Sequence, residues 1–252
     1  LFRRVMLGLG TGITSFGVSG ELLPALETGN PFLKLWLKYN TGITQISNSL
    51  LAWDDQSGNS NNAIQLTASR QPEYSSGDIK FNISGDNDHR LDLTSDITLG
   101  QFTIICSLEV SHRETIGLMG SASDNCLRFH QGGDVDRISL LLPDTTDEDA
   151  DMLNLTSDVP FRTKFVFTMI RSAGPDDNVV VRFDGSDVTD TNSGRDDSNP
   201  LEKFIVNDIG TAAGNFANWR GEINEVAIFN TAITDTTLLA SIENDISTRS
   251  GV

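Results

Sequence analysis

Cysteine and histidine are scarce in this chain. It has two cysteines, Cys106 and Cys126, and three histidines, His89, His112 and His130, among 252 residues. Two cysteines do not make a disulfide framework, and both lie in apolar segments, where buried free thiols are common. Because no histidine stands at a zinc-ligand spacing from a cysteine, the sequence argues against a zinc site.

Long apolar runs and positive charge are lacking as well. No run of about 18 apolar residues occurs, so the sequence predicts no membrane-spanning helix. Lysine and arginine number 18 against 35 acidic residues, which gives a net charge of −17. A surface this acidic repels phosphate backbones and anionic lipid, so we expect neither nucleic acid nor membrane as a partner.

What the chain does have is a series of short apolar segments with glycine, proline and polar residues between them. Their spacing of roughly ten residues is typical of all-β sandwiches and barrels, and no alternation of strands with helices appears. The sequence therefore predicts an all-β fold. The segments of the middle of the chain are 102–110, 115–119, 126–130, 138–142, 161–170 and 179–183.

The most informative stretch is 219–230, near the C-terminus. It predicts a long strand in which Glu222 and Glu225 lie on opposite faces, and from Val226 on both faces are apolar, as in a strand buried on both sides. A short helix is expected to follow. Thr234 is its candidate N-cap, Asp235 lies in its first turn, and the apolar positions are Leu238, Leu239, Ile242 and Ile246.

Several segments together resemble laminin-G-like, or concanavalin A-like, jelly-roll domains. The stretch from Trp53 to Ala63 is similar to the family pattern Trp-x-Asp-x-Ser-Gly-x-Gly-x-x-Ala, with Ser60 in place of the second glycine. The segments 70–74, 79–83 and 86–91 continue the likeness, and 219–230 resembles the closing strand. The resemblance covers roughly residues 33–246. It implies an antiparallel β-sandwich jelly roll with one short C-terminal helix.

Residues 1–31 differ from the rest of the chain. Their only charges are Arg3, Arg4, Glu21 and Glu27, which cancel, and six glycines separate apolar residues. We expect an apolar N-terminal arm for assembly or attachment, followed by a jelly-roll domain over 32–252. A cleavable signal with a basic start and a first strand of the sandwich are the alternatives. The apolar arm residues are Phe2, Met6, Leu7, Leu9, Ile13 and Phe16.

The strand at 219–230 is the segment that would carry the catalytic carboxylates if the chain were a glycoside hydrolase of the resembling fold. Glycoside hydrolases of the resembling fold carry Glu-x-Asp-x-Glu on one strand, as two carboxylates must flank the scissile bond. Here Asn224 stands where aspartate is needed, and Val226 and Ala227 occupy the places of the second glutamate. We therefore expect no catalytic residues and no enzyme, and we read Glu222 and Glu225 as residues that brace loops.

Calcium is the candidate ion, because jelly rolls of the resembling family bind it in loops through carboxylate and carbonyl oxygens. The main candidate ligands are two acidic pairs, and a solvated acidic loop is the alternative for each. Further acidic clusters occur at 147–151 and 176–177. The candidate pairs are Asp54 with Asp55 and Asp86 with Asp88.

Glycan binding is the other expectation that the resemblance carries. Lectin sites combine an aromatic platform with amide and carboxylate groups. Trp219 is the candidate platform, beside Asn215 and Asn218, with burial in the core as the alternative.

Because laminin-G-like jelly rolls occur in virion surface proteins, the resemblance, together with the apolar arm and the acidic remainder of the chain, implies a non-enzymatic virion structural protein of the capsid decoration or fibre type. Its arm would bind other virion subunits and copies of itself, and its jelly roll would face outward at the virion surface and contact host glycans. A secreted, extracellular, calcium-dependent lectin is the alternative, followed by a glycoside hydrolase with an unfamiliar acid pair.

Overall fold

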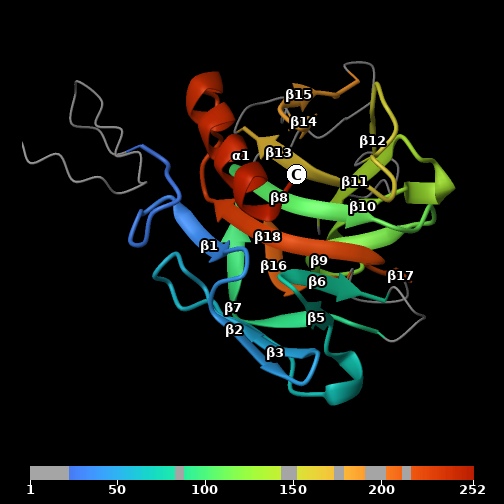
Figure 1. Cartoon of the computed structure of the whole chain (residues 1–252). Coiled ribbons are helices and arrows are strands. Elements are labelled where there is room, and N and C mark those ends of the chain that lie inside the picture. Colours follow the sequence, from blue (N-terminus) through green and yellow to red (C-terminus); the bar gives the residue numbers. More distant parts are fainter. Residues whose placement is uncertain (1–22, 83–87, 143–151, 173–178, 191–202, 212–216) are drawn as a thin grey trace, which may run out of the picture.

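The computed structural model describes residues 23–82, 88–142, 152–172, 179–190, 203–211 and 217–252 (Figure 1). The described chain is built almost wholly of β-strands. The first nine are β1 (Leu33–Leu37), β2 (Ile43–Ile46), β3 (Ser49–Trp53), β4 (Ala63–Ile64), β5 (Glu73–Ser75), β6 (Asp78–Phe81), β7 (Leu91–Leu99), β8 (Phe102–Val110) and β9 (Ile116–Ala122). The others are β10 (Asn125–Phe129), β11 (Arg137–Leu141), β12 (Met152–Asn154), β13 (Lys164–Arg171), β14 (Val179–Phe183), β15 (Ser186–Asp187), β16 (Phe204–Ile209), β17 (Ala217–Asn218) and β18 (Gly221–Phe229).

The strands form two antiparallel layers, which confirms the predicted β-sandwich. In the first layer β18 pairs with β8, β8 with β13 and β13 with β14, while β1 and β6 share the other edge of β18. In the second layer the order is β4, β7, β16, β9, β10, β11 and β12. The short strand β3 pairs with both β4 and β5 and so joins the layers at one end.

The core lies between the two layers and follows the strand alternation that the sequence predicts. Phe102 of β8 meets Phe204 of β16 with ring centroids 5.7 Å apart, and Phe129 of β10 meets Phe167 of β13 at 5.0 Å. The intervening residues of β8 and β13 point to the outer face of the first layer. The outer face of the first layer carries the C-terminal helix.

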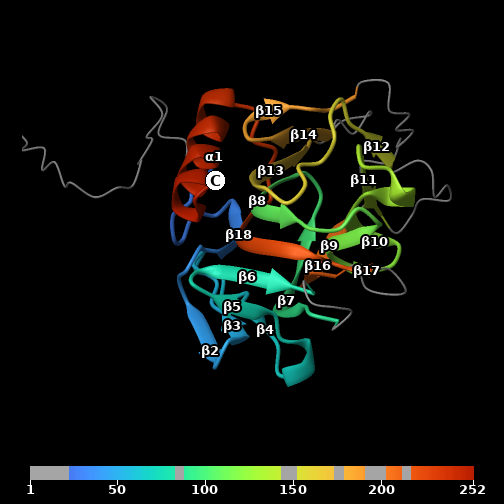
Figure 2. The ribbon, with the colours of Figure 1, turned by 45° about the vertical axis from the view of Figure 1, so that its right-hand side comes forward.

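One α-helix occurs among the described residues, α1 (Thr236–Ser250), and it packs across that outer face beside β8, β13 and β18 (Figures 1 and 2). Its N-cap is Asp235 rather than Thr234, because the Asp235 carboxylate accepts hydrogen bonds from the backbone N–H groups of Thr237 and Leu238. Among the described residues, no helix has both the length and the apolar character needed to cross a membrane.

Both cysteines are buried and free. Burial, with a further contribution from the charge of Glu225, raises the pKa of the Cys106 thiol, so it behaves as a small apolar core residue. The residues named for the N-terminal arm lie outside the described residues, and the arm therefore stays a prediction.

Candidate functional site

Five charged residues form a continuous row across the outer face of the first layer. The strand register pairs them in sequence, from β5 through β6, β18 and β8 to β13. Directly paired residues on neighbouring strands share a face, so all five side chains project from the same side of the sheet. The row is Glu73, Lys80, Glu222, Glu109 and Lys164. Together with Asp78, which lies two residues before Lys80 on β6, we call this surface the open half.

A β-bulge explains why both glutamates of β18 lie on this face. Glu222 pairs with Glu109 and Glu225 with Ser107, so three residues of β18 advance against two of β8. The extra residue shifts the alternation by one, and the expectation that Glu222 and Glu225 face opposite ways is wrong. Bulges of this kind re-aim a side chain, and here the bulge adds Glu225 to the face that carries Glu222.

Gly221 brings β18 unusually close to β8 at the start of the row. Its φ is +144°, and a Cβ added there would lie 1.8 Å from the carbonyl oxygen of Glu109. Only glycine permits this approach, since any side chain would collide with backbone. The close contact places the carboxylates of Glu222 and Glu109 on directly adjacent positions of the two strands.

Glu222 is buried and held by three polar partners. Its side chain is 8% exposed, and Asn224 Nδ2 donates to its Oε2 at 3.1 Å. The ammonium groups of Lys164 and Lys80 lie 3.4 Å and 3.9 Å from its carboxylate oxygens. Two cations and an amide donor stabilise the negative charge of a buried carboxylate.

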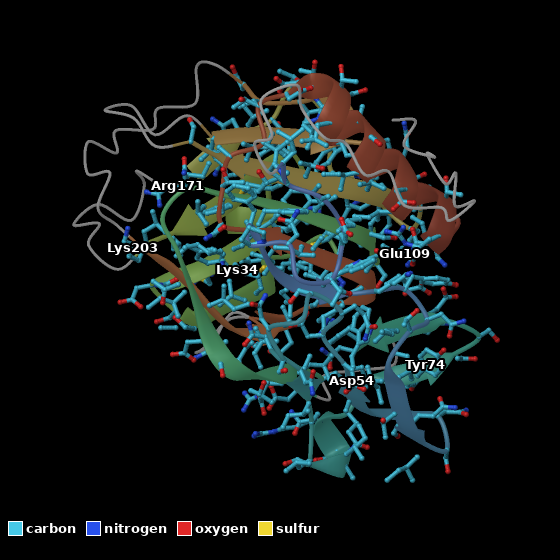
Figure 3. The ribbon with its side chains drawn as sticks, turned by 90° about the vertical axis from the view of Figure 1, so that its left-hand side faces the viewer. Lys34, Asp54, Tyr74, Glu109, Arg171 and Lys203 are labelled. Atoms are coloured by element: carbon cyan, nitrogen blue, oxygen red, sulfur yellow. The ribbon has the colours of Figure 1, made fainter. Side chains whose placement is uncertain are left out.

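Glu109 differs from Glu222 in its environment. Its carboxylate has no hydrogen bond or ion pair among the described residues, and the side chain is partly exposed (Figure 3). Burial and then the negative charge of Glu222 raise its pKa, against the opposing charges of Lys164 and Lys80. The row thus places a carboxyl group with a raised pKa beside one that is paired with two lysines.

Lys164 links the open half to Asp78. Its Nζ lies 2.6 Å from Asp78 Oδ1, with both side chains about a quarter exposed, at 26% and 25%. Burial lowers the pKa of Lys164, but the hydrogen bond to Asp78 and the charge of Glu222 outweigh burial and raise it. Lys164 is therefore a permanent cation at the surface of the row.

The neighbouring part of the same face is closed by α1, and we call it the covered half. Its apolar residues on the sheet are Trp36, Ile105, Val166, Ala227 and Phe229, and those on the helix are Leu239, Ile242 and Ile246.

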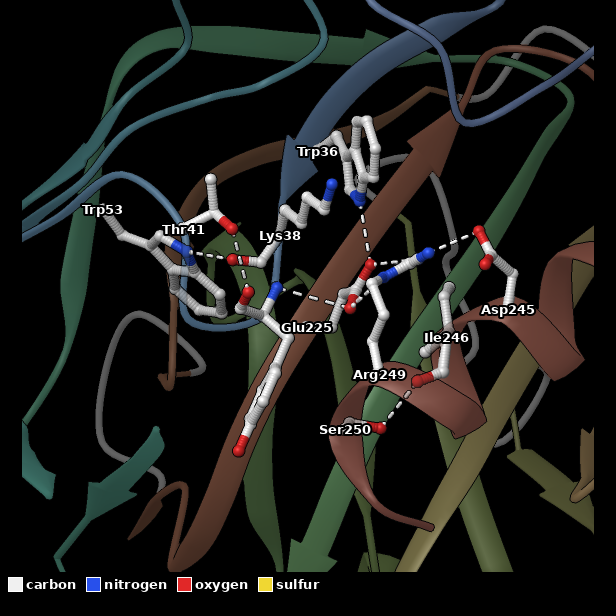
Figure 4. Close-up of polar contacts among 10 residues, drawn as sticks. Trp36, Lys38, Thr41, Trp53, Glu225, Asp245, Ile246, Arg249 and Ser250 are labelled. Carbon is white, nitrogen blue, oxygen red and sulfur yellow. Dashed lines mark hydrogen bonds and ion pairs between the residues drawn. The ribbon is translucent and has the colours of Figure 1, made fainter. Parts of the chain in front are cut away.

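The boundary between the halves is an ion pair (Figure 4). Glu225, which is fully buried, binds Arg249 Nη2 of α1 at 2.6 Å and accepts a hydrogen bond from Trp36 Nε1 at 2.8 Å. The helix ends one residue after Arg249, with Gly251 as its C-cap, and the row of charges lies beyond it.

The open half can bind a polyhydroxylated ligand through groups that are already in position. Glu109 offers a carboxyl group with free hydrogen-bonding capacity, and Lys80 and Lys164 offer ammonium donors held by their carboxylate partners. Such an array of fixed donors and acceptors suits sugar hydroxyl groups, which act as both.

The structure places the predicted glycan platform in the core. Trp219 is 0% exposed, its ring meets Phe129 edge-on at 5.2 Å, and its Nε1 donates to the carbonyl of Glu222. No ring face is left for a sugar, so Trp219 supports the start of β18 instead. Asn218 does lie nearer the surface, while Asn215 lies outside the described residues.

The structure brings together two residues that the sequence assigned to different sites. Asn218 Nδ2 donates to Asp88 Oδ1 at 2.9 Å, and Asp88 also pairs with Arg70 at 2.9 Å. Asp86, its predicted partner in a calcium site, lies outside the described residues, as do the clusters at 147–151 and 176–177. The contacts of Asp88 are those of a residue that ties loops together.

Asp55 is a loop brace rather than an open metal ligand. Its carboxylate accepts hydrogen bonds from the backbone of Trp36, Ser57 and Asn61 and from the Ser57 hydroxyl. Asp54 is exposed and lies well away from Glu109 in Figure 3. Within the described ranges, no group of three or more His, Cys, Asp or Glu side chains is arranged to hold a metal ion.

Sequence reasoning missed Glu109, Lys80 and Lys164 as site residues. Alternation within the predicted strand 102–110 does place Glu109 on the face opposite Leu108 and Val110. The missing information was long-range pairing, because neither β8 beside β18 nor β6 beside β18 can be read from local pattern. Only the register assembles the five charges into one row.

The chain is an all-β sandwich domain, and solved structures that share its fold include two glycosidases. A Trypanosoma rangeli sialidase in complex with sialic acid is 14% identical, with a TM-score of 0.55, over 88% of this chain and 34% of the sialidase chain. A GH54 α-L-arabinofuranosidase soaked with a cyclic sulfate inhibitor is 14% identical, with a TM-score of 0.58, over 80% of this chain and 51% of that chain. The chain thus spans about a third and about half of these two enzymes. No family model and no curated protein matches it.

These matches correct the predicted function. At 14% identity they establish the fold, and the proteins that share it here are carbohydrate-active enzymes rather than virion proteins. The expectation of a non-enzymatic virion structural protein, with no enzymatic role, is therefore wrong. That expectation depended on an acidic surface and an apolar arm. One jelly-roll architecture serves many functions, so these two features do not define the function of a chain. The predicted partner subunits and location remain predictions.

Proposed function

We propose that this chain forms the saccharide-binding β-sandwich of a carbohydrate-active enzyme, and that the saccharide binds on the open half. One observation carries the proposal: a row of partly exposed, positioned charges lies uncovered where the rest of the same sheet face is closed by α1. The similarity in fold to a sialidase and an arabinofuranosidase supports it.

The polar groups of the open half are suited to sugars because they are held in place before binding. Lys164 is bound between Asp78 and Glu222, and Glu222 is bound by Asn224. A ligand therefore meets side chains whose conformational entropy has already been lost on folding, and this raises affinity for a given set of contacts.

The test is equilibrium binding to a panel of neutral and acidic polysaccharides. We expect Glu109→Gln and Lys164→Met each to weaken binding by about tenfold, the loss of one or two hydrogen bonds to a charged group. Lys203→Met is the matched control, because Lys203 is an exposed lysine far from Glu109 in Figure 3. Equal affinity of all four proteins, or no binding to any polysaccharide, would contradict the proposal.

Hydrolysis of the bound saccharide is a second candidate function, and the contrast between the two glutamates favours it. Glu109 has a raised pKa, while Glu222 lies between two lysines, a difference in environment like that between the acid and the carboxylate of a glycosidase. Directly paired residues have Cβ atoms about 5 Å apart, which suits the roughly 5 Å carboxyl separation of retaining enzymes.

Reducing ends released from the same polysaccharide panel would measure this activity. We expect Glu109→Gln and Glu222→Gln each to abolish it, and we expect the wild-type rate to fall as pH rises and Glu109 loses its proton. Activity that survives both substitutions would rule out this pair. Binding without any release of reducing ends would leave the saccharide-binding function in place and reject hydrolysis.

A further inference from the structure

Two arginines lie against one aromatic ring at the end of the open half. The guanidinium carbons of Arg113 and Arg162 lie 4.5 Å and 5.0 Å from the ring centroid of Phe161. Both arginines are exposed, and Phe161 is half-buried against the main core. The ring thus holds two cationic groups at the surface, within the distance at which a cation–π contact is favourable.

Neither arginine has an acidic partner among the described residues. This is unusual in a chain with 35 acidic side chains against 18 basic ones. Several other arginines of the described chain do form an ion pair with an acidic side chain. The pairs are Arg70 with Asp88, Arg90 with Asp92, Arg137 with Asp134, Arg182 with Glu243 and Arg249 with Glu225.

A buried histidine near Arg113 adds no positive charge to this region. His130 is 0% exposed, and its two ring nitrogens make no hydrogen bond with the described residues. Burial, followed by the charge of Arg113 and that of His112, lowers the pKa of His130 to about 4, with Asp158 acting in the opposite direction. His130 is therefore neutral at physiological pH and leaves the positive charge to the arginines.

The arginine pair is continuous with the open half. The backbone N–H of Arg162 donates to the carbonyl of Val110 at 2.8 Å, one residue beyond Glu109, and Lys164 lies opposite Glu109. Arg162 also has a φ of +55°, a left-handed conformation that a non-glycine residue seldom adopts. The backbone there turns out of the strand path, and the Arg162 guanidinium lies on Phe161.

We propose that Arg113 and Arg162 bind the carboxylate or sulfate group of an acidic saccharide that lies along the open half. Two guanidinium groups that contact the same ring repel each other, and an anion that accepts charge-assisted hydrogen bonds from them lowers that repulsion. This inference rests on the proposed saccharide-binding function and adds the charge of the ligand to it.

The test compares acidic polymers with neutral polymers of the same backbone. Polygalacturonate is paired with its methyl-esterified form, and dextran sulfate with dextran, in 0.15 M salt, where a Debye length of about 8 Å screens the overall acidity of the protein. The full chain is used as wild type, as Arg113→Met with Arg162→Met, and as Arg137→Met. The last variant is the matched control, since the charge of Arg137 is paired with Asp134. Methionine keeps the apolar stem on Phe161 and removes the charge.

We expect the wild type to bind at least one acidic polymer about tenfold more tightly than its neutral partner, and the double variant to lose that preference while keeping its affinity for the neutral polymer. Arg137→Met should behave as the wild type. Equal affinity for acidic and neutral polymers, or a preference that survives in the double variant, would overturn the inference while the saccharide-binding function stands. Failure of every polymer to bind would reject both. The pair of polymers that shows the preference separates a carboxylate ligand from a sulfate ligand.

Discussion

The two halves of one sheet face have opposite surroundings, although the same strands build both. In the covered half, Ala227 and Phe229 of β18 lie under Ile242 and Ile246 of α1. In the open half, Glu222 of the same strand lies beyond the helix, between Lys80 and Lys164. The contrast shows that the helix covers the apolar part of the face together with the buried pair of Glu243 and Arg182, while the row of charges lies beyond the helix. The polar groups of the open half hold one another in place and do not depend on the helix.

The largest expected effect comes from breaking the boundary between the halves. Arg249→Met should destabilise the fold by about 3 kcal/mol, because it leaves the buried carboxylate of Glu225 without its cation. Urea unfolding monitored by circular dichroism measures the change. Asp245→Asn, which removes only the exposed partner of Arg249, is the control and should cost less than about 0.5 kcal/mol. Equal effects of the two substitutions would show that the buried pair does not close the covered half.

A cavity under the helix should also destabilise the fold, by less than the loss of the Arg249 charge. Ile242 is 5% exposed and packs between α1 and the sheet, so Ile242→Ala should cost about 2–3 kcal/mol of unfolding free energy. Saccharide binding should not change, because the open half is not part of that packing. A loss of affinity in the folded variant would show that the helix and the open half act together.

Removal of a charge from the open half should weaken saccharide binding with little loss of stability, the opposite of what is expected for Ile242→Ala. Lys164→Met is expected to cost about 1 kcal/mol or less, since Lys164 is about a quarter exposed and Glu222 keeps Lys80 and Asn224 as partners. Binding should nevertheless weaken by about tenfold. Unfolding curves and saccharide titrations on the same samples compare the two effects. A large loss of stability without a change in affinity would assign the row a structural role alone.

The smallest expected effect is on the pH dependence of stability. The pKa of Glu109 is raised in the folded state, so the folded protein binds more protons than the unfolded chain just above the ordinary glutamate pKa, and stability falls as pH rises through that range. Glu109→Gln should remove this part of the slope, by less than about 1 kcal/mol because the side chain is partly solvated.

A second acidic pair on the other layer serves as the comparison for that experiment. Burial, followed by the charge of Asp92, raises the pKa of Asp208 to about 6, so Asp208 contributes a slope of the same sign from its ordinary pKa up to about pH 6. Asp208→Asn should flatten the stability profile over that range without any effect on saccharide binding. If Asp208→Asn also weakens binding, the ligand does not lie on the open half.

Most of the fold could be predicted from local sequence pattern. The strands at 102–110 and 179–183 have the expected bounds, because core residues alternate along them without interruption. The helix begins one residue later than expected, because Thr234 and Asp235 are both good N-caps and only the hydrogen bonds of Asp235 decide between them.

The candidate site could not be predicted in the same way. The bulge in β18 places Glu222 and Glu225 on one face, and a bulge leaves no mark in the alternation of a sequence. The burial of Trp219 depends on Phe129, which lies 90 positions earlier in the chain and comes into contact only through the packing of the two layers. Local pattern thus predicted the strands, while long-range register created the row of charges.

The most direct test of the account is a map of the saccharide-binding surface by amide chemical shifts. A ¹⁵N-labelled sample would be titrated with the polysaccharide that binds most tightly in the panel. We predict that the shifts concentrate on Lys80, Glu109, Lys164 and Glu222 and their strand neighbours, and that the amides under α1 and around Asp88 stay unchanged. Shifts that gather around Asp88 and Asn218, with none on the open half, would contradict the account.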